Sequence, residues 1–315
     1  MKYMIALDGG TTNTRLTLMK NGEPVTRVKL KVGARDGKAA LSAALAEALP
    51  PFLCENDITE ADISAIAASG MVTSELGLYT LPHISAPAGA DELAHGAAKV
   101  SFPEITSVPF YFIPGVKTFD SPDAPLSDMD IMRGEETETV AILSALSHTS
   151  GKATLILPGS HMKIVNCEDG KIVRFSTTLS GELTRAAAEN TILQNSIGDI
   201  FYRDPDISAL HEGYALADSL GVAAALFKLR VAGNFKDADK CVLYSMLLGI
   251  ILHDDVRAVV NAADGTAIVG GSNPFRAAYI ALLEGKVSSV VGVPEDIAEN
   301  AAAIGAAAVF ERIVE

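Results

Sequence analysis

The chain lacks tryptophan altogether and is poor in cysteine and in basic residues. Its three cysteines, Cys54, Cys167 and Cys241, are widely spaced and include no CxxC pair, which argues against a disulfide framework or a zinc site. A reduced, cytoplasmic setting is therefore expected. Lys and Arg number 25 against 39 Asp and Glu, for a formal net charge of −14. Because nucleic-acid and anionic-membrane binders present a basic face, we expect neither partner.

Long apolar runs are also missing. The most apolar stretch, Ala301–Phe310, is shorter than the about 20 residues that span a bilayer, so we expect a packed helix. The N-terminal sequence MKYMIALDGG lacks the apolar core of a signal peptide. Apolar residues still make up 49% of the 315 residues, which is enough for two domains. A homodimer is plausible from the general frequency of oligomers alone.

The order of predicted elements occurs twice: strand, tight turn, strand, hairpin turn, strand, then helices. The first series begins at Tyr3, with Asn21-Gly22 as its hairpin turn, and the second begins at Thr154. The segment 120–130, with two prolines and four aspartates, is typical of a linker. We therefore predict domains at 1–128 and 129–315, in a duplicated α/β fold with a ligand in a central cleft.

Helical spacing predicts several helices whose ends are marked by capping or breaking residues. The expected helix Lys38–Leu49 stops at Pro50-Pro51. Asp91–Val100 begins at a plausible cap. Further along the chain, Leu216–Val231 and Ala238–His253 each read as one continuous helix.

The first motif with chemical potential is DGGTTNTR, which begins at Asp8. Gly9 and Gly10 permit a tight turn, and the residues that follow offer hydroxyl, amide and backbone N–H groups to phosphate oxygens. Asp8 ends a strand, where its carboxylate can reach Mg²⁺ directly or through water. An ordinary Asp-Gly-Gly turn explains the residues equally well. The phosphate-binding candidates are Gly9, Gly10, Thr11, Thr12 and Asn13.

The second motif, DIMRGEETE at 130–138, places Glu135 and Glu136 in the first turn of an expected helix. Acidic residues suit the dipole there, so a stable helix start is the favoured interpretation of these residues alone. The third motif, Pro158-Gly159-Ser160-His161-Met162-Lys163, follows a strand and mirrors the first. Gly159 and Ser160 are candidates for phosphate binding, Lys163 for neutralising charge and His161 for positioning a hydroxyl, although a lone histidine is more often structural.

The fourth motif, Gly270-Gly271-Ser272, follows a strand and precedes a helix. It offers bare backbone to a base or ribose, although a routine strand–helix turn explains it as well. The order of the four motifs is that of the actin-like ATPase (ribonuclease H-like) fold of sugar kinases, hexokinase and actin. More specifically, MRGEET at 132–137, PGSH with Lys163, and Ser180-Gly181-Glu182-Leu183 resemble the 2-dehydro-3-deoxygalactonokinase family. The resemblance covers nearly the whole chain.

This resemblance implies an ATP- and Mg²⁺-dependent kinase acting on the 6-hydroxyl of 2-dehydro-3-deoxy-D-galactonate in galactonate catabolism. Related carbohydrate kinases take their catalytic base from a Gly-Asp-Gln segment at a helix start. Gly134-Glu135-Glu136 stands in the equivalent place, so Glu135 is the leading candidate for the base and Glu136 the second. Asp8 would hold the phosphates through Mg²⁺. Arg15, Arg133 and Lys163 are candidates for the substrate carboxylate or the transferred group, with His161 near the substrate, and Gly270, Gly271 and Ser272 for adenosine.

The chain departs from the family at two positions. These departures affect the expected identity of the sugar acid that accepts the phosphoryl group more than the expectation of phosphoryl transfer. The family usually has Trp directly after the first Asp and after the His-x-Lys segment, where this chain has Gly9 and Ile164. One alternative is a kinase of the same fold for another sugar or sugar acid. Another is an actin-like nucleotide-binding sensor without transferase activity, although the chain has no visible basic or helix-turn-helix segment for binding DNA.

Overall fold

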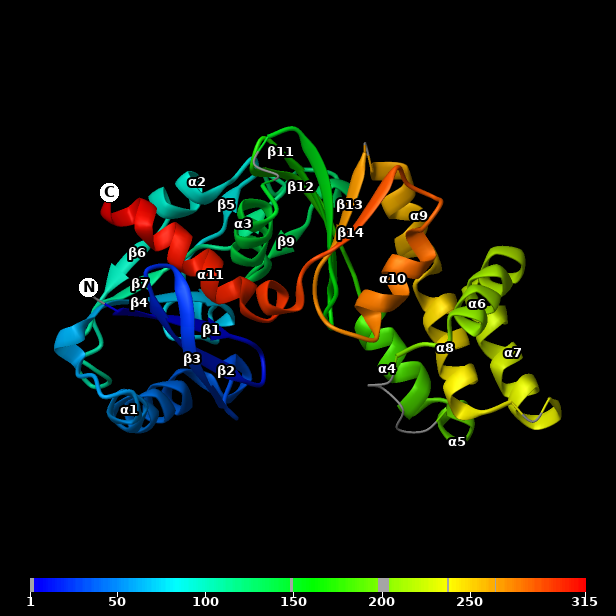
Figure 1. The fold of residues 1–315 in the computed structure, drawn as a ribbon, viewed down its shortest axis with the longest axis horizontal. Helices are drawn as coiled ribbons and strands as arrows, with labels where there is room; N and C mark the ends of the chain where they lie inside the picture. Colours follow the sequence, from blue (N-terminus) through cyan, green and yellow to red (C-terminus); the bar gives the residue numbers. More distant parts are fainter. Residues whose placement is uncertain (1–2, 148–149, 198–203, 237, 264) are drawn as a thin grey trace. The chain divides into compact units, whose positions relative to one another are not determined.

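The computed structural model describes residues 3–147, 150–197, 204–236, 238–263 and 265–315. Its chain forms two compact units. Unit 1 consists of Met1–Ser150, Glu168–Arg174 and Asn300–Glu315, and unit 2 of Gly151–Cys167 and Phe175–Glu299. Each unit combines helices with a mixed sheet (Figure 1), so the predicted α/β class is confirmed.

The main sheet of unit 1 has six strands in the order β3-β2-β1-β4-β7-β6. Its first three strands form an antiparallel meander, whereas β4 and β7 continue the sheet in parallel with β1. Asn21 and Gly22 turn β2 into β3 with φ of 54° and 80°, as the expected Asn-Gly hairpin requires. The strands are β1 (Tyr3–Gly9), β2 (Thr14–Lys20), β3 (Glu23–Leu30), β4 (Ile63–Gly70), β6 (Ala98–Val100) and β7 (Phe110–Phe112).

Helix α1 (Gly37–Glu55) packs on one face of this sheet. Its predicted end at Pro50-Pro51 is wrong, because the helix continues through both prolines. Phe52 and Leu53 lie beyond them and are buried in the same core as the strands. Each such side chain contributes about 1.5–3 kcal/mol on burial, which compensates for the backbone hydrogen bonds that proline cannot make.

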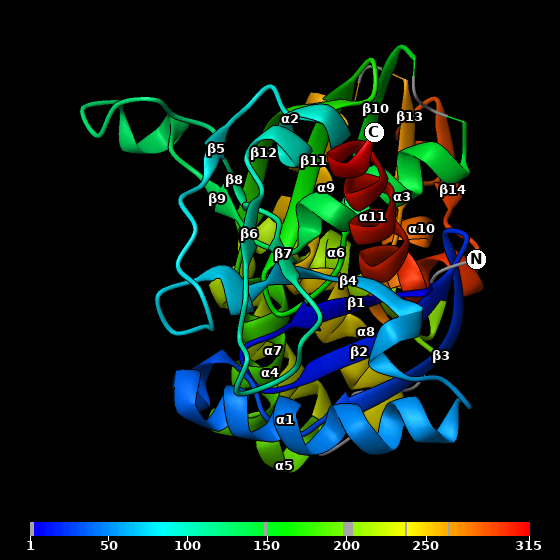
Figure 2. The same cartoon turned by 90° about the vertical axis from the view of Figure 1, so that its left-hand side faces the viewer.

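Helices α3 (Glu135–Ala145) and α11 (Glu295–Val314) lie across the sheet from α1, as Figures 1 and 2 show. Gly305 permits their close packing, since a Cβ there would lie 1.8 Å from the carbonyl oxygen of Thr137. Tyr111 and Phe310 then meet edge to face, with ring centroids 5.1 Å apart. The C-terminal helix is therefore part of the core of unit 1.

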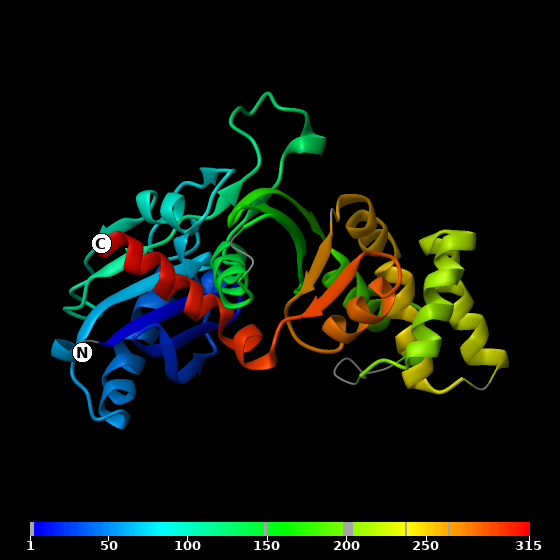
Figure 3. The same ribbon diagram turned by 45° about the horizontal axis from the view of Figure 1, so that its top comes forward.

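The acidic segment 120–130 is an exposed loop within unit 1 (Figure 3). Its two ends are joined by β8 (Val116–Lys117) and β9 (Ile131–Met132), which pair antiparallel and form a small sheet with β5 (Ile84–Ser85). The compact units thus differ from the expected lobes, because α3 and α11 pack with the first sheet. A functional division into 1–128 and 129–315 stays a prediction.

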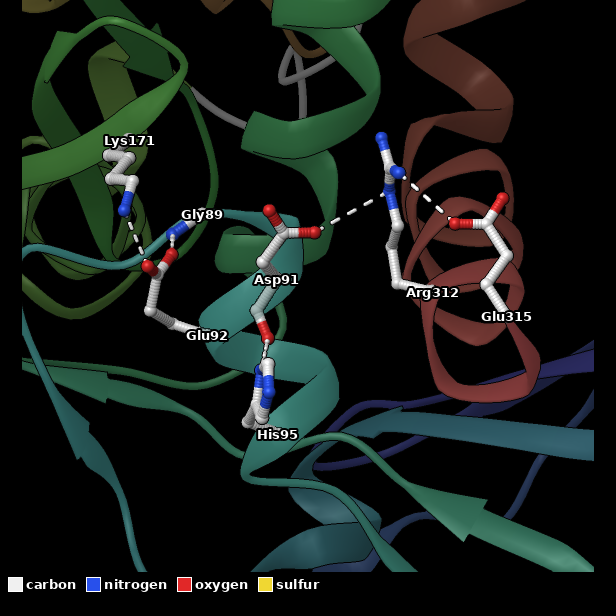
Figure 4. A network of polar contacts seen from close by, with 7 residues as sticks. All are labelled: Gly89, Asp91, Glu92, His95, Lys171, Arg312 and Glu315. Carbon is white, nitrogen blue, oxygen red and sulfur yellow. Dashed lines mark hydrogen bonds and ion pairs between the residues drawn. The ribbon is translucent and has the colours of Figure 1, made fainter.

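Helix α2 (Ala90–His95) is shorter than the predicted Asp91–Val100, because 98–100 pair with β7 instead. A polar network surrounds it (Figure 4). Lys171 Nζ lies 2.5 Å from Glu92 Oε1, and Arg312 pairs with Asp91 at 3.5 Å. Ala88 and Ile172 exchange two backbone hydrogen bonds of 3.0 and 2.8 Å. These contacts explain why the hairpin tip Glu168–Arg174 belongs to unit 1.

Unit 2 contains a five-stranded sheet in the order β12-β11-β10-β13-β14. Strands β10, β13 and β14 are mutually parallel. The strands are β10 (Lys152–Leu157), β11 (Met162–Glu168), β12 (Lys171–Thr178), β13 (Thr266–Val269) and β14 (Ser289–Gly292). The helices are α4 (Ser180–Asn190), α5 (Gln194–Ile197), α6 (Ile207–Leu220), α7 (Val222–Phe235), α8 (Lys240–Ile251), α9 (His253–Ala262) and α10 (Phe275–Leu283).

Helix α8 lies at the centre of the helical part of unit 2, and nine of its residues are buried. Gly249 allows α6 to approach it, because a Cβ there would lie 2.0 Å from the carbonyl oxygen of Leu210. The predicted continuous helix Leu216–Val231 is wrong. Gly221, with φ of 78°, separates α6 from α7. Across the described ranges, we find no helix with the length and apolar character that crossing a membrane requires.

Candidate active site

The turn between β1 and β2 is anchored by the backbone of the segment that follows β3. Gly10 N–H donates to the carbonyl of Asn13 at 2.8 Å. The carbonyls of Gly10 and Thr11 accept from the N–H groups of Ala34 and Arg35 at 3.0 and 3.1 Å. The side chains of Thr11 and Thr12 remain exposed. This arrangement leaves the hydroxyls accessible, as binding of phosphate oxygens requires.

Asp8 and Arg15 face each other across the first two strands. Their register places them directly opposite, and Arg15 Nη1 lies 2.8 Å from Asp8 Oδ2. The sequence motif therefore supplies both a carboxylate and its neutralising cation. In unit 1, the predicted substrate residue Arg15 lies next to the predicted metal ligand.

The family usually has tryptophan at two positions, and in this chain both are closely surrounded by neighbouring residues. A Cβ on Gly9 would lie 2.1 Å from Val72 Cγ1, so this backbone leaves no room for a larger residue. Ile164 is buried in β11 within the core of unit 2. The chain thus replaces two large rings with aliphatic packing at these positions.

The MRGEET motif meets the first motif through two glycines in unit 1. Gly134, with φ of 118°, precedes α3, and a Cβ on it would lie 3.4 Å from Gly70 Cα. Gly70, with φ of 78°, pairs with Gly9, and a Cβ on it would lie 3.3 Å from Asp8 Oδ1. The start of α3 and the end of β1 are therefore adjacent, although about 130 residues of sequence separate Asp8 from Gly134.

The two candidate bases differ in their surroundings. Glu136 is fully buried, and both of its carboxylate oxygens accept from Gly134 N–H, at 2.9 and 2.7 Å. Burial and the neighbouring Glu135 raise the pKa of Glu136 to about 8. Glu135 is partly exposed and accepts from Arg133 N–H at 3.2 Å. Glu135 is thus more accessible to solvent than Glu136.

Glu138 is a further member of this acidic group that the sequence analysis did not single out. Burial, followed by the charges of Glu135, Asp8 and Glu136, raises its pKa to about 8. Its position three residues after Glu135 places it on the same side of α3, a spacing that could have revealed it. We refer to Asp8, Glu135, Glu136 and Glu138 as the acidic site of unit 1.

Arg133 is bound to the segment that follows β4. Its guanidinium donates to the carbonyls of Thr73 and Leu81 at 2.9 Å each, to the Thr73 hydroxyl, and to His83 Nδ1 at 3.2 Å. Burial and the charges of Arg133 and Lys117 lower the pKa of His83 to about 4, so its imidazole is neutral. The predicted role of Arg133 toward substrate stays a prediction, beside this structural one.

In unit 2, residues Pro158–His161 form a turn that we call the Gly159 turn. The start of α4 holds it: Glu182 N–H donates to the carbonyl of Ser160 at 3.1 Å, and His161 Nε2 lies 3.0 Å from Glu182 Oε1. Gly181 is required for this contact, because a Cβ there would lie 2.0 Å from the carbonyl oxygen of Gly159. The third motif and the Ser180-Gly181-Glu182 segment are therefore one structural site.

The remaining predicted residues of unit 2 lie around the same turn. Lys163 is almost fully buried and donates to Thr177 Oγ1 at 2.8 Å. Gly270 N–H donates to the carbonyl of Ile156 at 2.9 Å. Gly271, with φ of 68°, packs against Pro158, whose Cδ would lie 2.9 Å from an added Cβ. Motifs three and four are thus neighbours within unit 2, and Ser272 continues the second of them.

Among the residues that the structure describes, none form a group of three or more His, Cys, Asp or Glu suited to hold a metal ion. Mg²⁺ is commonly bound by one or two carboxylates together with substrate phosphates and water. Asp8, near the end of β1 beside the bare backbone of Gly70, fits that mode of binding.

The chain is similar in sequence to several known proteins. The family model described as 2-keto-3-deoxy-galactonokinase matches residues 8–308. A "Probable 2-dehydro-3-deoxygalactonokinase" of Rhizobium meliloti (strain 1021) is 26% identical, covering 97% of this chain and 96% of that protein. A 2-dehydro-3-deoxygalactonokinase of Escherichia coli (strain K12) is 28% identical over 60% of this chain and 58% of its own length.

Solved structures show the fold. A crystal structure from Sinorhizobium meliloti, provisionally named a 2-dehydro-3-deoxygalactonokinase protein, has a TM-score of 0.80 at 21% identity and covers 99% of both chains. An activator of 2-hydroxyisocaproyl-CoA dehydratase from Clostridium difficile, solved with bound ADPNP, has a TM-score of 0.52 at 12% identity and covers 98% of this chain and 95% of its own. These likenesses confirm the predicted actin-like ATPase fold.

Proposed function

Because the chain belongs to the 2-keto-3-deoxy-galactonokinase family, we propose that it transfers the γ-phosphoryl group of ATP to the 6-hydroxyl of 2-dehydro-3-deoxy-D-galactonate. The product is 2-dehydro-3-deoxy-6-phosphogalactonate. The names of the Rhizobium and Escherichia relatives support this acceptor. The observation that carries the proposal is the position of Glu135, partly exposed at the start of α3, directly after Gly134, which packs against Gly70 beside Asp8.

In this proposal Glu135 accepts the proton of the attacking hydroxyl. A general base must remain ionised and reachable, and the buried Glu136, with its raised pKa, is less suited to that role. Glu136 instead holds Gly134 N–H and so fixes the helix start on which Glu135 stands. Arg15 neutralises Asp8 and is a candidate in unit 1 for contact with the transferred group.

Phosphoryl transfer depends mainly on positioning and on stabilising negative charge. Mg²⁺, when bound at Asp8, supplies charge neutralisation for the phosphate oxygens. Within unit 1, the backbone of Gly9 and Gly10 and the side chains of Thr11, Thr12 and Asn13 bind phosphate. Within unit 2, the Gly159 turn binds phosphate, Gly270–Ser272 bind adenosine, Lys163 neutralises negative charge and His161 positions a hydroxyl of the substrate.

A coupled assay for ADP release over a panel of sugar acids tests the proposal. The panel contains the 2-dehydro-3-deoxy acids derived from galactonate and from gluconate, together with the intact galactonate and gluconate. We expect the highest kcat/KM for the galactonate-derived 2-dehydro-3-deoxy acid. A tenfold or greater preference for another acid would identify a kinase of the same family with a different acceptor.

The alternative of a nucleotide-binding sensor without transferase activity is tested by the same panel. Such a protein would bind ATP but release no ADP in response to any sugar acid. Removal of Mg²⁺ by a chelator separates the two cases further, because the proposed kinase loses turnover in its absence and regains it when Mg²⁺ is added in excess.

A further inference from the structure

Asp255 is a buried carboxylate of unit 2 that lies outside every motif considered above. It belongs to α9 and is 2% exposed. Tyr279 of α10, itself fully buried, donates its hydroxyl to Asp255 Oδ2 at 2.6 Å. The hydroxyls of Thr178 and Ser180 also form hydrogen bonds with this carboxylate. Three separate elements therefore converge on one buried acidic side chain.

Burial of a carboxylate is costly unless hydrogen bonds stabilise the charge. Here burial raises the pKa of Asp255, whereas the hydrogen bonds from Tyr279, Ser180 and Thr178 act in the opposite direction. Hydrogen bonds are directional, so a buried carboxylate can fix the positions of its partners in a way that apolar packing does not. Two partners of Asp255 lie where β12 ends and α4 begins.

The start of α4 is the segment that holds the Gly159 turn. Thr178 and Ser180 lie 3.0 Å apart at their hydroxyls, and Ser180 also accepts from Thr184 Oγ1 through its carbonyl, at 2.7 Å. Directly after Ser180 come Gly181, in close contact with the Gly159 carbonyl, and Glu182, whose N–H donates to Ser160. Asp255 is thus connected to the Gly159 turn by its hydrogen bond with Ser180, followed by the next residue of α4, Gly181, which contacts the turn.

We propose that Asp255 is a positioning residue for the phosphate-binding turn of unit 2. Its carboxylate, oriented by Tyr279, fixes Thr178 and Ser180, and through them the Gly181–Glu182 backbone that sets the conformation of the Gly159 turn. The inference rests on the proposed function insofar as that turn binds the phosphates of ATP. Asp255 itself does not touch the nucleotide.

The positioning role has a signature in the kinetics. The acidic site with Glu135 lies in unit 1, whereas Asp255 and the Gly159 turn lie in unit 2. Asp255→Asn should therefore raise the Kd and KM for ATP by about tenfold, since displacement of a binding group by a fraction of an ångström is costly. It should leave KM for the sugar acid within twofold. Thr178→Val and Ser180→Ala should reproduce the effect in part.

The matched control is Ser245→Ala. Ser245 is a fully buried hydroxyl in α8 of the same unit, bonded to the carbonyl of Cys241 and to Asp206 N–H rather than to α4. Its removal should lower the Tm without changing Kd for ATP. Tyr279→Phe removes one donor but leaves Thr178 and Ser180 in contact with Asp255, so its effect on ATP affinity should be smaller than that of Asp255→Asn.

The measurement is the Kd for ATP by calorimetry, at a temperature at which every variant is folded by circular dichroism, together with steady-state kinetics. If Asp255→Asn and Thr178→Val lower the Tm as Ser245→Ala does but bind ATP within twofold of wild type, the positioning role is wrong. A different result would contradict the proposed function, namely a wild type that binds ATP but phosphorylates no sugar acid. In that case the calorimetric comparison would still decide the role of Asp255. Wild-type protein that binds no ATP would overturn both.

Discussion

Units 1 and 2 hold their candidate site residues by different physical means. In unit 1, two glycines with positive φ bring the ends of β1, β4 and α3 together and bring four carboxyl groups close to one another. In unit 2, the N–H of Glu182 holds the Gly159 turn, and the hydroxyls near the start of α4 are hydrogen-bonded to one buried carboxylate, Asp255. The first arrangement suits proton transfer, and the second suits the fixed placement of a bound group.

The sharpest test of this difference is Glu135→Gln. We expect kcat to fall by about 10²-fold or more if Glu135 is the general base, with KM for ATP little changed because Glu135 is not among the residues proposed to bind ATP. Steady-state kinetics with both substrates would measure this. Glu136→Gln is the matched control, and a result in which it loses kcat while Glu135→Gln keeps it would transfer the role of base to Glu136.

A second test addresses the backbone of unit 1. Gly134→Ala places a side chain at φ of 118° and 3.4 Å from Gly70 Cα. We expect a loss of about 1–2 kcal/mol of stability, as for other non-glycine residues in this region, and a fall in kcat of about tenfold.

Gly285→Ala is the control for strain alone, because Gly285 has φ of 74° and no atom within 4 Å of an added Cβ. It should lower the free energy of unfolding without lowering kcat. Equal losses of kcat in the two variants would show that the contact between α3 and β4 does not matter for catalysis.

A third test concerns Arg133, whose guanidinium contacts three residues of the segment 73–83. Arg133→Lys keeps the charge but cannot reproduce the planar set of donors. We expect a loss of about 2 kcal/mol in the free energy of unfolding by denaturant, given about 1.5–3 kcal/mol for a hydrogen bond to a charged group. Arg185→Lys, in an exposed pair with Glu189 on α4, should have almost no effect. An unchanged KM for the sugar acid in Arg133→Lys would favour the structural role alone.

The smallest expected effect is on the pH dependence of stability. The folded-state pKa of Glu136 is raised from 4.5 to about 8, so its stabilising contribution is complete below 4.5 and is lost as the pH rises toward 8. The wild type should therefore be less stable at pH 8 than at pH 6.5. His83 contributes little to this difference, because its lowered pKa affects stability mainly as the pH falls from 6.5 toward 4.

Glu136→Gln removes one titrating group from this interval. The difference in free energy of unfolding between pH 6.5 and 8 should shrink by on the order of 1–2 kcal/mol. Urea titrations at the two pH values would measure it. A difference that is the same in the variant and in the wild type would place the titrating group elsewhere, and Glu138→Gln would then be examined in the same way.

Features that depend on interactions over a few residues could be predicted from the sequence, whereas features that depend on contacts between distant parts of the sequence could not. Asn21-Gly22, the first three strands and the start of α3 were predictable, because turn chemistry and period-two alternation act over a few residues. The continuation of α1 through Pro50-Pro51 was not, because Phe52 and Leu53 are held by strands that are distant in sequence. The break at Gly221 was missed because one glycine within an apolar helical pattern is often tolerated.

Within the candidate site, the motifs were visible in the sequence but their partners were not. Glu182 was noted for its resemblance to a family motif, yet only the fold places it on Ser160 and His161. His83 and Asp255 gave no sequence signal, since their hydrogen-bond partners are distant in the sequence. Val72 was equally invisible, although it occupies the space beside Gly9 where a tryptophan was expected.

The hairpin tip Glu168–Arg174 has a consequence for how the molecule can be divided. It comprises the end of β11, the turn and the start of β12 in the five-stranded sheet, yet it packs with unit 1, as does the C-terminal stretch from Asn300. Unit 1 is thus assembled from three separate stretches of the gene product, and no single continuous fragment contains it. A protein cut at residue 128 or 150 would lose α11 and expose the apolar surface that α11 covers. Expression as two pieces, domain exchange with a relative, or deletion from the C-terminus would each divide a core rather than a linker.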